Sequence, residues 1–468
     1  MSESVIAPAG VASPAGSAVT RNLLVDYYDR LAGVIGHLVQ DPAPVREPDA
    51  FSPGFLLPPL DDAVRRFLAV ATAEWRSLAE HAGTRLLLLD LTGNPGTNTT
   101  KTFASLLIVA RAVEFIRRSG EPVVVFTPTS GNKGIALRDA VLRALDAGLA
   151  SPDQLRVVVI APEACRDKLR SSRLAEDPEL RRRNPVLLYR GSDPEGVKEV
   201  GRRVAREHAA TFRARHGANL WFSLELPNYL LADAARAFFE HDVAPTAGAA
   251  SRVHAHAVSS AYGLLGYNLG RDVLEATGDA GPGDRPGFLL VQHLGAPDMV
   301  LSLLHGGFSR ERIPGFVLDP GTGLHEQRRD PHFPAATYDP HEVLDPTFYT
   351  HEPVTSPQMN AIIERFGGAG IVVSLYECLA RYPLLRRWLE PTSRPLPGDP
   401  RALREWSLVM ALTGVMNALD RGLVPPGGDV VVHGSGSYSA TDYRRLGDAA
   451  ITPIATVDDA VAALEVGC

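Results

Sequence analysis

Short apolar runs alternate with helical stretches from Arg85 almost to the end of this 468-residue chain. A chain in which buried strands and helices alternate folds into mostly parallel sheets covered by helices. Ligands in such α/β folds bind at the carboxyl ends of the strands. The sequence therefore predicts an α/β protein with its site at those ends. The predicted strands are residues 122–126, 156–160, 186–189, 219–223, 253–258, 288–292, 371–374 and 429–433.

The first 84 residues precede this pattern and are predicted to form a tail and a helical extension. Residues 1–18 are rich in Ala, Gly, Ser and Pro, which is typical of a loose tail. Residues 23–39 and 61–82 place apolar side chains at helical spacing. A proline-rich connection separates these two stretches, so we expect two helical segments rather than one.

Composition narrows the kind of partner. A net charge of −7 with 22% charged residues gives no basic surface for nucleic acid, which favours a small-molecule partner. The three cysteines, Cys165, Cys378 and Cys468, form neither a disulfide framework nor a metal-ligand cluster. The first residues resemble no export signal, and no segment is long and apolar enough to cross a bilayer. We expect a soluble cytoplasmic protein that does not bind membranes.

One lysine lies at a junction between a strand and a helix. Residues 86–109 read as an apolar strand, a turn-rich loop and a helix, and Lys101 stands where the loop becomes the helix. Residues 93–96 break the strand, and residues 97–100 supply hydroxyls but no second charge. An ammonium between apolar walls loses hydration, which lowers its pKa. Such a lysine suits a nucleophile or a Schiff-base partner.

Two alternatives exist for the loop that contains Lys101. It superficially resembles a nucleotide-binding loop, which would make the protein an NTP-dependent transferase. That motif needs Gly immediately before the Lys and another Gly five residues earlier, where this chain has Thr100 and Pro95. Glycines there let the backbone wrap closely around a phosphate, so their absence weakens this interpretation. The other alternative is a solvated lysine at the start of a helix.

A second strand, loop and helix start follow in residues 123–138. The backbone N–H groups of Ser130, Gly131 and Asn132 would point at an anion, and a carboxylate would suit the loop. A turn of this kind is also a common connection between a strand and a helix.

Together the two loops resemble those of the fold-type II pyridoxal-phosphate enzymes, the group of threonine synthase, threonine dehydratase, cysteine synthase and the tryptophan synthase β subunit. Residues 94–101 look like the lysine loop of that group, and Thr129-Ser-Gly-Asn132-Lys-Gly-Ile-Ala-Leu is close to its asparagine loop. The resemblance covers roughly residues 85–445 and implies pyridoxal 5′-phosphate as the cofactor. It implies that Lys101 forms the Schiff base and that Asn132 hydrogen-bonds the 3-oxygen of the cofactor. The substrate carboxylate would be held by Thr129, Ser130, Gly131 and Asn132.

Two later turns would complete the cofactor site. In the family a glycine-rich loop binds the cofactor phosphate, and here hydroxyls and helix N–H groups would have to do so. The residues of this turn are Ser259, Ser260, Ala261, Tyr262 and Gly263. After the last core strand, the resemblance places Ser435 or Ser437 against the pyridine nitrogen, and another register places His433 there. A neutral partner at that nitrogen favours elimination over transamination.

Three features depart from the family or suggest other chemistry. Lys133 replaces the histidine that commonly follows the loop asparagine, and it either binds an acidic substrate tail or is solvated. Residues 313–357 have no counterpart, and they form either a cap over the active site or a structural insertion. His254 and His256 alternate on a strand and face one way, but no cysteine accompanies them, so we expect no metal.

The resemblance implies a two-lobed fold-type II protein. The larger lobe would combine residues 85–102 and 216–468, and the smaller lobe, residues 103–215, would carry the asparagine loop. The implied activity is that of a lyase or transferase in a specialised biosynthetic pathway. It would act on an amino acid by β- or γ-elimination or replacement through Lys101, as a homodimer. The alternatives are the NTP-dependent transferase and a catalytically silent protein that keeps the fold.

Overall fold

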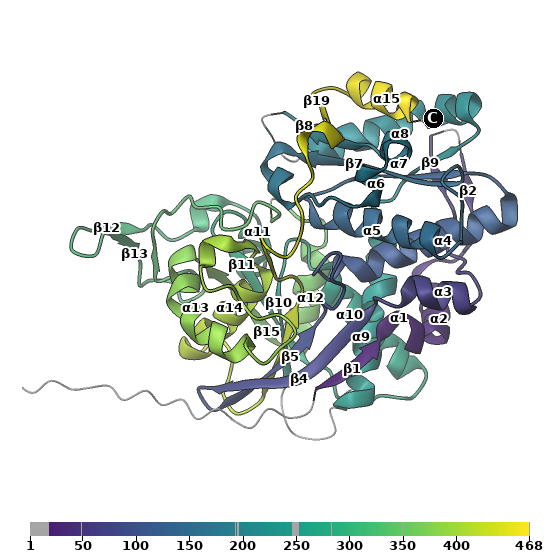
Figure 1. Ribbon diagram of the computed structural model, residues 1–468. Helices are drawn as coiled ribbons and strands as arrows, with labels where there is room; N and C mark the ends of the chain where they lie inside the picture. Colours follow the sequence, from purple (N-terminus) through teal and green to yellow (C-terminus); the bar gives the residue numbers. More distant parts are fainter. Residues whose placement is uncertain are drawn as a thin grey trace, which may run out of the picture.

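The computed structural model describes residues 18–47, 49–191, 193, 196–245, 252–281, 283–348 and 350–467. In these residues the chain forms two lobes, each built on its own sheet (Figure 1). The tail predicted for residues 1–18 lies, except for residue 18, outside the described residues. The mixed α/β fold with mostly parallel sheets covered by helices confirms the predicted fold class, and all eight predicted strands are present.

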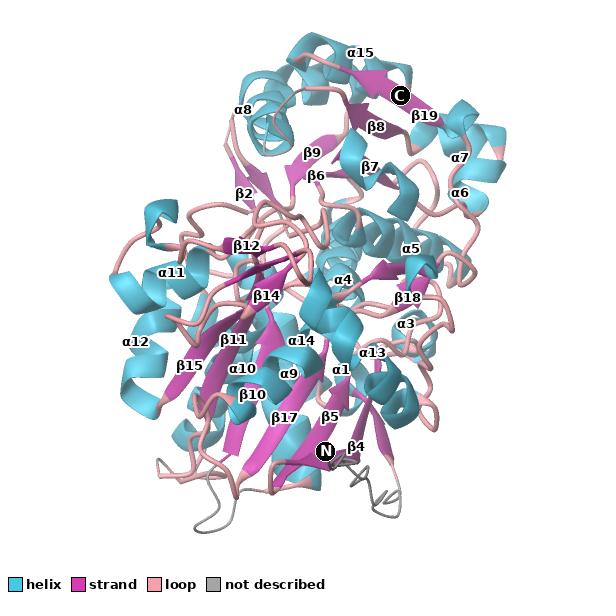
Figure 2. Ribbon diagram, turned by 90° about the vertical axis from the view of Figure 1, so that its left-hand side faces the viewer, coloured by secondary structure: helices cyan, strands magenta, loops and turns pink. Residues whose placement is uncertain are grey.

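Seven of the described strands form the sheet of the larger lobe, in the order β1-β4-β5-β17-β10-β11-β15. From β5 onward neighbouring strands are parallel, whereas β1 and β4 add an antiparallel edge (Figure 2). The strands are β1 (Val19–Asn22), β4 (Thr72–His81), β5 (Thr84–Asp90), β10 (Arg252–Ala257), β11 (Gly287–His293), β15 (Gly368–Val373) and β17 (Asp429–Gly434).

Helices cover both faces of this sheet, because successive side chains of a strand point to opposite sides. Leu86 and Leu88 of β5 belong to one buried cluster with α13 and α14. Leu87 and Leu89 belong to another with α9 and α10. The covering helices are α9 (Leu226–Val243), α10 (Tyr262–Ala276), α13 (Leu375–Leu389) and α14 (Ser407–Asp420).

The sheet of the smaller lobe has the order β19-β8-β7-β6-β9, with every described pair parallel. Val124 and Phe126 pack with α8 and α15 on one face, and Val123 and Val125 pack with α4 and α5 on the other. The strands are β6 (Val123–Pro128), β7 (Leu155–Pro162), β8 (Val186–Tyr189), β9 (Asn219–Phe222) and β19 (Ile451–Ile454). The helices are α4 (Lys101–Ser119), α5 (Asn132–Asp146), α8 (Gly196–His216) and α15 (Val457–Val466).

Two strands of the smaller sheet fall outside residues 103–215, the range predicted for the smaller lobe. β9 follows that range and pairs with β6, and β19 lies within residues 216–468 yet pairs with β8. The chain is led to β19 because it first runs along the segment after β7, where Leu446 N donates to Leu169 O at 2.8 Å. Hydrogen bonds between segments far apart in the sequence set both boundaries, and no local pattern reveals them.

The N-terminal extension is not purely helical. Residues 23–39 form α1 (Leu23–Asp26) and α2 (Tyr28–Leu38) as predicted. Of residues 61–82, only α3 (Asp62–Leu68) is helical, and most of the remainder forms β4. Ala82 and Gly83 have φ of 49° and 72°, and two successive positive φ values make the tight turn of a β-hairpin. This turn folds β4 back on β5 and overrides the helical spacing.

Residues 313–357 begin with a small antiparallel sheet, β12-β13-β14, which projects from the larger lobe (Figure 1). Leu318 in β12 is 52% exposed. The later part of the segment returns to the body of the protein, where Asp345 is fully buried. A capping role for the segment stays a prediction. The strands are β12 (Val317–Asp319), β13 (Leu324–Glu326) and β14 (Ala336–Thr337).

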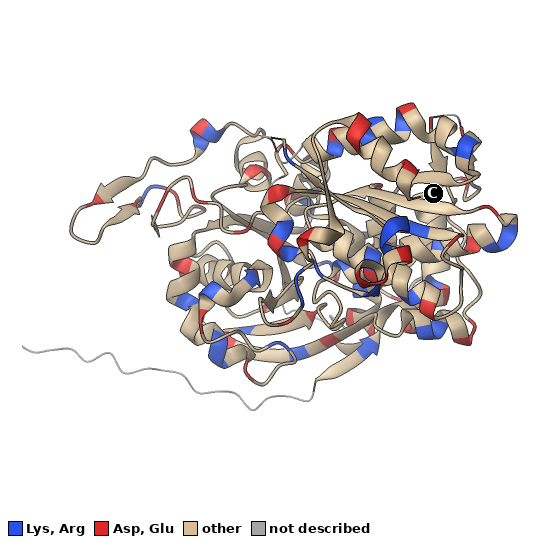
Figure 3. Cartoon of the chain, turned by 45° about the horizontal axis from the view of Figure 1, so that its top comes forward, with Lys and Arg blue, Asp and Glu red and all other residues tan. Residues whose placement is uncertain are grey.

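The remaining elements connect the two lobes or lie at their edges. They are β2 (Val45–Arg46), β3 (Phe51–Ser52), η1 (Glu163–Lys168), α6 (Arg173–Glu176), α7 (Pro178–Arg183), α11 (Asp298–His305), η2 (Arg310–Arg312), α12 (Ser356–Phe366), η3 (Pro400–Ala402), β16 (Leu403–Glu405), β18 (Tyr438–Ser439) and η4 (Asp448–Ala450). Among the described helices, none combines the length and apolar character needed to cross a membrane. Basic and acidic residues are interspersed along the chain in both lobes (Figure 3).

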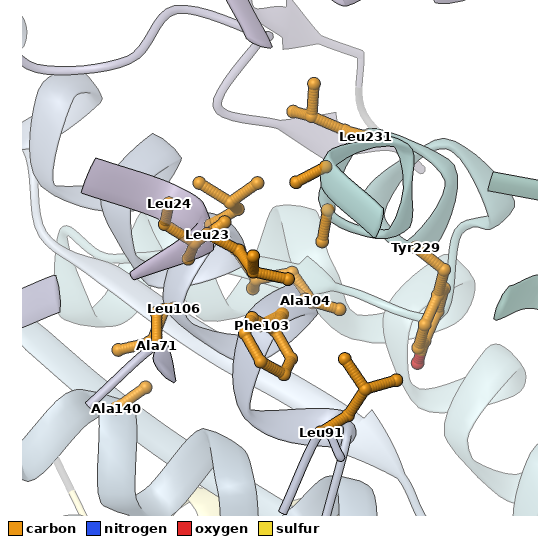
Figure 4. Packing of buried hydrophobic residues seen from close by; sticks show 14 of the residues in the cluster. Leu23, Leu24, Ala71, Leu91, Phe103, Ala104, Leu106, Ala140, Tyr229 and Leu231 are labelled. Carbon is orange, nitrogen blue, oxygen red and sulfur yellow. The ribbon is translucent and has the colours of Figure 1, made fainter. Parts of the chain in front are cut away.

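A large buried cluster anchors the helix that begins with Lys101. Phe103 and Leu106 of α4 lie in this cluster with Leu23 and Leu24 of α1 (Figure 4). All four side chains are at most 2% exposed. Because packed side chains on neighbouring turns hold the first turn of α4, the position of Lys101 is set by the core rather than by the loop before it.

We expect Leu89→Ala to lower the free energy of unfolding by about 2–5 kcal/mol, because it leaves a cavity at a fully buried position of β5. The matched control is Leu318→Ala at the exposed hairpin, which should change stability by less than about 0.5 kcal/mol. Urea denaturation measures both. Equal effects of the two substitutions would contradict the placement of Leu89 in the core.

Candidate active site

Lys101 is the first residue of α4, directly after the loop that leaves β5. Its Nζ lies 5.7 Å from the centroid of the Tyr229 ring, which belongs to α9. Burial lowers the pKa of Lys101. The Asp233 carboxylate opposes this shift, and the Arg236 guanidinium adds to it. In the described part of the chain Nζ donates no hydrogen bond. The structure thus presents a desolvated amine without a hydrogen-bond partner.

The lysine loop is fastened to the loop that follows β17. Thr100 N donates to Ser435 O at 2.8 Å, and Ser437 N donates to Asn98 O at 3.2 Å. Asn98 has a φ of 54°, a left-handed conformation that asparagine tolerates better than most residues. Lys101 and Ser435, two predicted cofactor residues that are far apart in the sequence, therefore lie on neighbouring loops.

The asparagine loop lies between β6 and α5 and closes on itself. Gly131 N and Gly134 N donate to the Thr129 hydroxyl at 3.0 and 2.7 Å. These bonds occupy Thr129 and the N–H of Gly131, two of the groups predicted to hold a carboxylate. Of the predicted groups, Ser130 is half-buried in the same loop. The fold brings the loop together as expected, while its role in binding stays a prediction.

Asn132 begins α5, and its side-chain amide is bonded on both sides. Its Nδ2 donates to Glu405 Oε2 at 2.7 Å, and its Oδ1 accepts from the Tyr438 hydroxyl at 2.7 Å. Both partners belong to the larger lobe, so the amide links the lobes at the predicted site.

A buried ion cluster lies next to Asn132, and sequence reasoning did not identify it. Lys168 Nζ donates to Asp345 at 2.8 Å and to Glu405 at 2.9 Å. The two carboxylates outweigh the effect of burial and raise the pKa of Lys168 well above its ordinary value. Asp345 comes from residues 313–357, so this segment reaches the groups around Asn132. Lys168 therefore stays an ammonium ion.

Lysine is rare in this sequence, and this rarity could have drawn attention to Lys168. The chain has four lysines, and the other 43 of its 47 basic residues are arginines. Three of the four, Lys101, Lys133 and Lys168, lie on the two loops and on η1, around one region between the lobes. In a chain that uses arginine for nearly all positive charge, a lysine marks a place where a compact amine is needed.

Lys133 is buried rather than solvated. It is 6% exposed, its Nζ donates to Ser223 O at 3.2 Å, and it lies 5.5 Å from the centroid of the Tyr229 ring. Burial lowers its pKa to about 7, against the attraction of Glu225 and with the repulsion of Lys101. Two amines with lowered pKa values, those of Lys101 and Lys133, therefore lie near the Tyr229 ring.

The turn predicted to hold the cofactor phosphate joins β10 to α10, which begins at Tyr262. Ala261 has a φ of 51°, a conformation that costs any residue except glycine about 1–2 kcal/mol. Gly263 lacks a Cβ for a steric reason, because such an atom would lie 2.5 Å from Nη1 of Arg236. Ser260 O accepts a 2.7 Å bond from Thr355. Arg236 therefore brings a positive charge against the first turn of α10.

Arg236 ends a buried chain of hydrogen bonds. Its Nη1 lies 3.1 Å from His433 Nδ1, and His433 Nε2 lies 2.8 Å from His254 Nδ1. His254 Nε2 lies 3.2 Å from Glu240. Burial and the neighbouring charges lower the pKa of His433 well below its ordinary value, so the ring is neutral. An arginine only donates, so His433 accepts at Nδ1 and donates from Nε2 to His254 Nδ1. His254 in turn donates from Nε2 to Glu240.

The hydrogen bonds of His433 help to distinguish the three candidates for the ring-nitrogen partner, which are His433, Ser435 and Ser437. Both ring nitrogens of His433 already lie at hydrogen-bond distance from other side chains. This disfavours the register that places His433 against the pyridine nitrogen. Ser435 Oγ is buried and, among the described residues, has no partner. Ser437 lines a separate cavity of about 90 Å³ with Tyr438. The three candidates are therefore in different surroundings, and Ser435 offers a buried hydroxyl without a partner among the described residues.

The two histidines considered for a metal do lie side by side with a third. The rings of His254 and His256 lie 5.1 and 5.4 Å from the ring of His433. Burial lowers the pKa of His256 to about 3. Within the described ranges, no three His, Cys, Asp or Glu side chains form a group that could hold a metal ion.

Lys133→Met should flatten the pH dependence of stability. Its folded pKa of about 7 lies below the ordinary 10.5, so between these values the unfolded chain holds a proton that the folded protein has lost. In that window this lysine makes stability rise by at most about 1.4 kcal/mol per pH unit, and the penalty is complete below pH 7. Urea denaturation at several pH values measures the slope. An unchanged slope in Lys133→Met would contradict the shift, and Lys198→Met controls for removing an amine elsewhere.

Comparisons with known proteins agree with the fold. No curated protein matches the chain. Threonine synthase from Escherichia coli is similar in structure, with a TM-score of 0.52, 13% identity and coverage of 82% of this chain and 78% of that one. Threonine synthase from yeast gives a TM-score of 0.50, 11% identity and coverage of 86% and 82%. At such identity the likeness shows the fold alone, and this is the fold-type II fold. A model of a family of unknown function, DUF6002, matches residues 19–466, so the chain belongs to the DUF6002 family.

Proposed function

We propose that this protein is a pyridoxal-phosphate-dependent lyase or transferase that acts on an amino acid by β- or γ-elimination or replacement. Lys101 carries the proposal. It is a desolvated amine without a hydrogen-bond partner in the described residues, at the strand–loop–helix junction where the family resemblance expects the cofactor lysine. The structurally similar threonine synthases support the fold that the proposal needs.

The residues around Lys101 fit the three functional groups of pyridoxal 5′-phosphate. Among the described residues, Ser435 Oγ, His256 Nε2 and Arg236 Nε are buried without a partner. Buried polar atoms are rarely left unpaired, so this set is consistent with a missing polar ligand. Lys101 would hold the aldehyde carbon, Arg236 and the first turn of α10 the phosphate, and Ser435 the ring nitrogen.

The other residues of the site divide the remaining tasks. When bound, the cofactor withdraws electrons from the substrate Cα. Lys101 Nζ, with its lowered pKa, would accept the Cα proton. Lys133, with a pKa of about 7, would lie over the same Tyr229 ring and favour an acidic leaving group or substrate tail. Asn132 would bind the 3-oxygen after exchanging one of its present partners, Glu405 or Tyr438.

The identity of the ring-nitrogen partner bears on the reaction class. A serine hydroxyl donates a hydrogen bond without supplying a full charge, so less negative charge from Cα is delocalised into the ring. This favours loss of a group from Cβ or Cγ over amino transfer. Elimination or replacement is therefore the reaction class that we propose.

The first test uses the absorbance of the protein. Incubation with pyridoxal phosphate should give a visible band that borohydride fixes on the peptide containing Lys101, identified by mass spectrometry. Lys101→Ala should lose the band and all turnover while its circular dichroism stays unchanged. Lys133→Ala is the matched control, because it removes the other amine beside Tyr229, and it should keep the band. A wild-type protein that stays colourless would favour the alternative of a catalytically silent protein that keeps the fold. Borohydride labelling of Lys133 instead of Lys101 would contradict the assignment of Lys101 as the cofactor lysine.

The second test addresses the reaction class. Ser435→Asp is expected to slow elimination and to increase the share of keto acid formed by amino transfer, because a carboxylate stabilises a protonated ring. Ser437→Asp changes a serine of the same loop that lines a different cavity, and its product ratio should match that of the wild type. Mass spectrometry of products from a panel of O-activated serines and homoserines measures the ratio. If Ser437→Asp changes the product ratio and Ser435→Asp does not, Ser437 rather than Ser435 is the partner of the ring nitrogen.

A further inference from the structure

A cavity of about 230 Å³ lies where α5, the segment after η1 and the C-terminal return of the chain meet. Its walls include the apolar side chains of Ile135, Leu169 and Leu446 and the hydroxyl-bearing Ser171 and Ser172. The lysine loop contributes Pro95 and Gly96 rather than Lys101. Nothing in the proposed reaction uses this cavity.

Arg170 faces the cavity with an incompletely satisfied guanidinium. It is 8% exposed, and among the described residues its Nε and Nη2 are buried without a partner. Its Nη1 donates to Gly96 O at 3.1 Å and to Asn98 Oδ1 at 3.0 Å. The Tyr438 and Tyr443 rings lie 4.4 and 4.6 Å from its central carbon. The guanidinium therefore lies against two aromatic rings and has two nitrogen atoms without a partner among the described residues.

Arg138 brings a second guanidinium to the same cavity. It is 6% exposed, and its only hydrogen bond within the described residues goes from Nη1 to Asn184 O at 2.6 Å. In the described ranges no carboxylate forms an ion pair with Arg138 or Arg170. Burial lowers the pKa of Arg138 to about 10, and no neighbouring charge opposes the shift. Both arginines are thus buried charges that form no ion pair within the described residues, although Asp442 attracts Arg170 from the cavity wall.

The carboxylates at the cavity have other partners. Asp139 pairs with Arg143 at 2.8 Å, and Asp442 accepts a 2.9 Å bond from the Ser439 hydroxyl, although its charge also attracts Arg170. Arg444, the third basic residue of the wall, forms an ion pair with Glu176. The cavity therefore carries an excess of positive charge.

We propose that this cavity binds a small metabolite through its carboxylate or phosphate group, held by Arg138 and Arg170. Leaving a buried charge unpaired costs several kcal/mol, which an anion between the two guanidiniums would recover. Guanidinium donors match the oxygen atoms of both anions. The hydroxyl of Ser172 offers a further donor, whereas that of Ser171 donates to Glu176. The apolar wall suits a short carbon skeleton. Because Pro95 and Gly96 line the cavity and Arg170 also holds the lysine loop at Gly96 and Asn98, the ligand would be in contact with that loop both directly and through Arg170.

Isothermal titration calorimetry with inorganic phosphate and with succinate, each at a constant ionic strength set with sodium chloride, tests the site. Saturable binding of at least one anion is expected, and comparing the two tells a phosphate ligand from a carboxylate ligand. Arg138→Gln should weaken binding about tenfold or more, since a hydrogen bond to a charged group contributes roughly 1.5–3 kcal/mol. Arg444→Gln, at the edge of the same cavity but paired with Glu176, should change it less than about threefold.

The result is independent of the proposed reaction. The titration uses protein without added cofactor, and Lys101→Ala should bind the anion as the wild type does even if the proposed activity proves wrong. The site is overturned if neither anion binds saturably or if Arg138→Gln binds as tightly as the wild type. Arg170→Gln gives a second check, because its loss of affinity should exceed that of Arg444→Gln in a protein whose circular dichroism is unchanged.

Discussion

The Arg236 guanidinium organises the region between the two lobes. It is 1% exposed and donates to Asp233 on its own helix and to Thr100, the residue before Lys101. It also contacts His433 at the end of β17, and Gly263 at the start of α10 leaves it room. Hydrogen bonds from a guanidinium have fixed directions, so one side chain constrains the relative positions of α9, the start of α4, β17 and the start of α10. The lysine junction is therefore supported by a charge as well as by the apolar cluster under α4.

Three lysines lie in this region in three different electrostatic settings. Lys168 faces two carboxylates and keeps its proton, whereas the pKa values of Lys101 and Lys133 are lowered by burial. The difference arises from neighbours rather than from depth, because all three are buried from most of the solvent. A protein that needs an uncharged amine beside a permanent ammonium ion can obtain both in this way. The proposed roles of Lys101 and Lys133 rest on these lowered pKa values.

The sequence was sufficient for much of the fold and for one part of the site. Eight strands follow from short apolar runs, because parallel strands buried on both faces have no alternation to confuse the pattern. Lys101 and Asn132 stand out because each lies at a local strand–loop–helix junction. Lys168, Asp345 and Glu405 could not be grouped, since they come from three segments whose spacing carries no period. Residues 72–81 were misread because their turn, Ala82-Gly83, lacks the Asn-Gly or Asp-Gly signature of hairpins.

The position of β19 has a consequence for how the chain acquires its native structure. Ile451 pairs with Val186, so the edge of the smaller sheet is completed by a segment that is synthesised long after β8. Until then β8 offers an open strand edge, which other chains can pair with. Contacts between such distant segments form slowly, because the intervening loop must close first. Synthesis of the smaller lobe therefore begins early, whereas its sheet is complete only after residues 451–454 have been made.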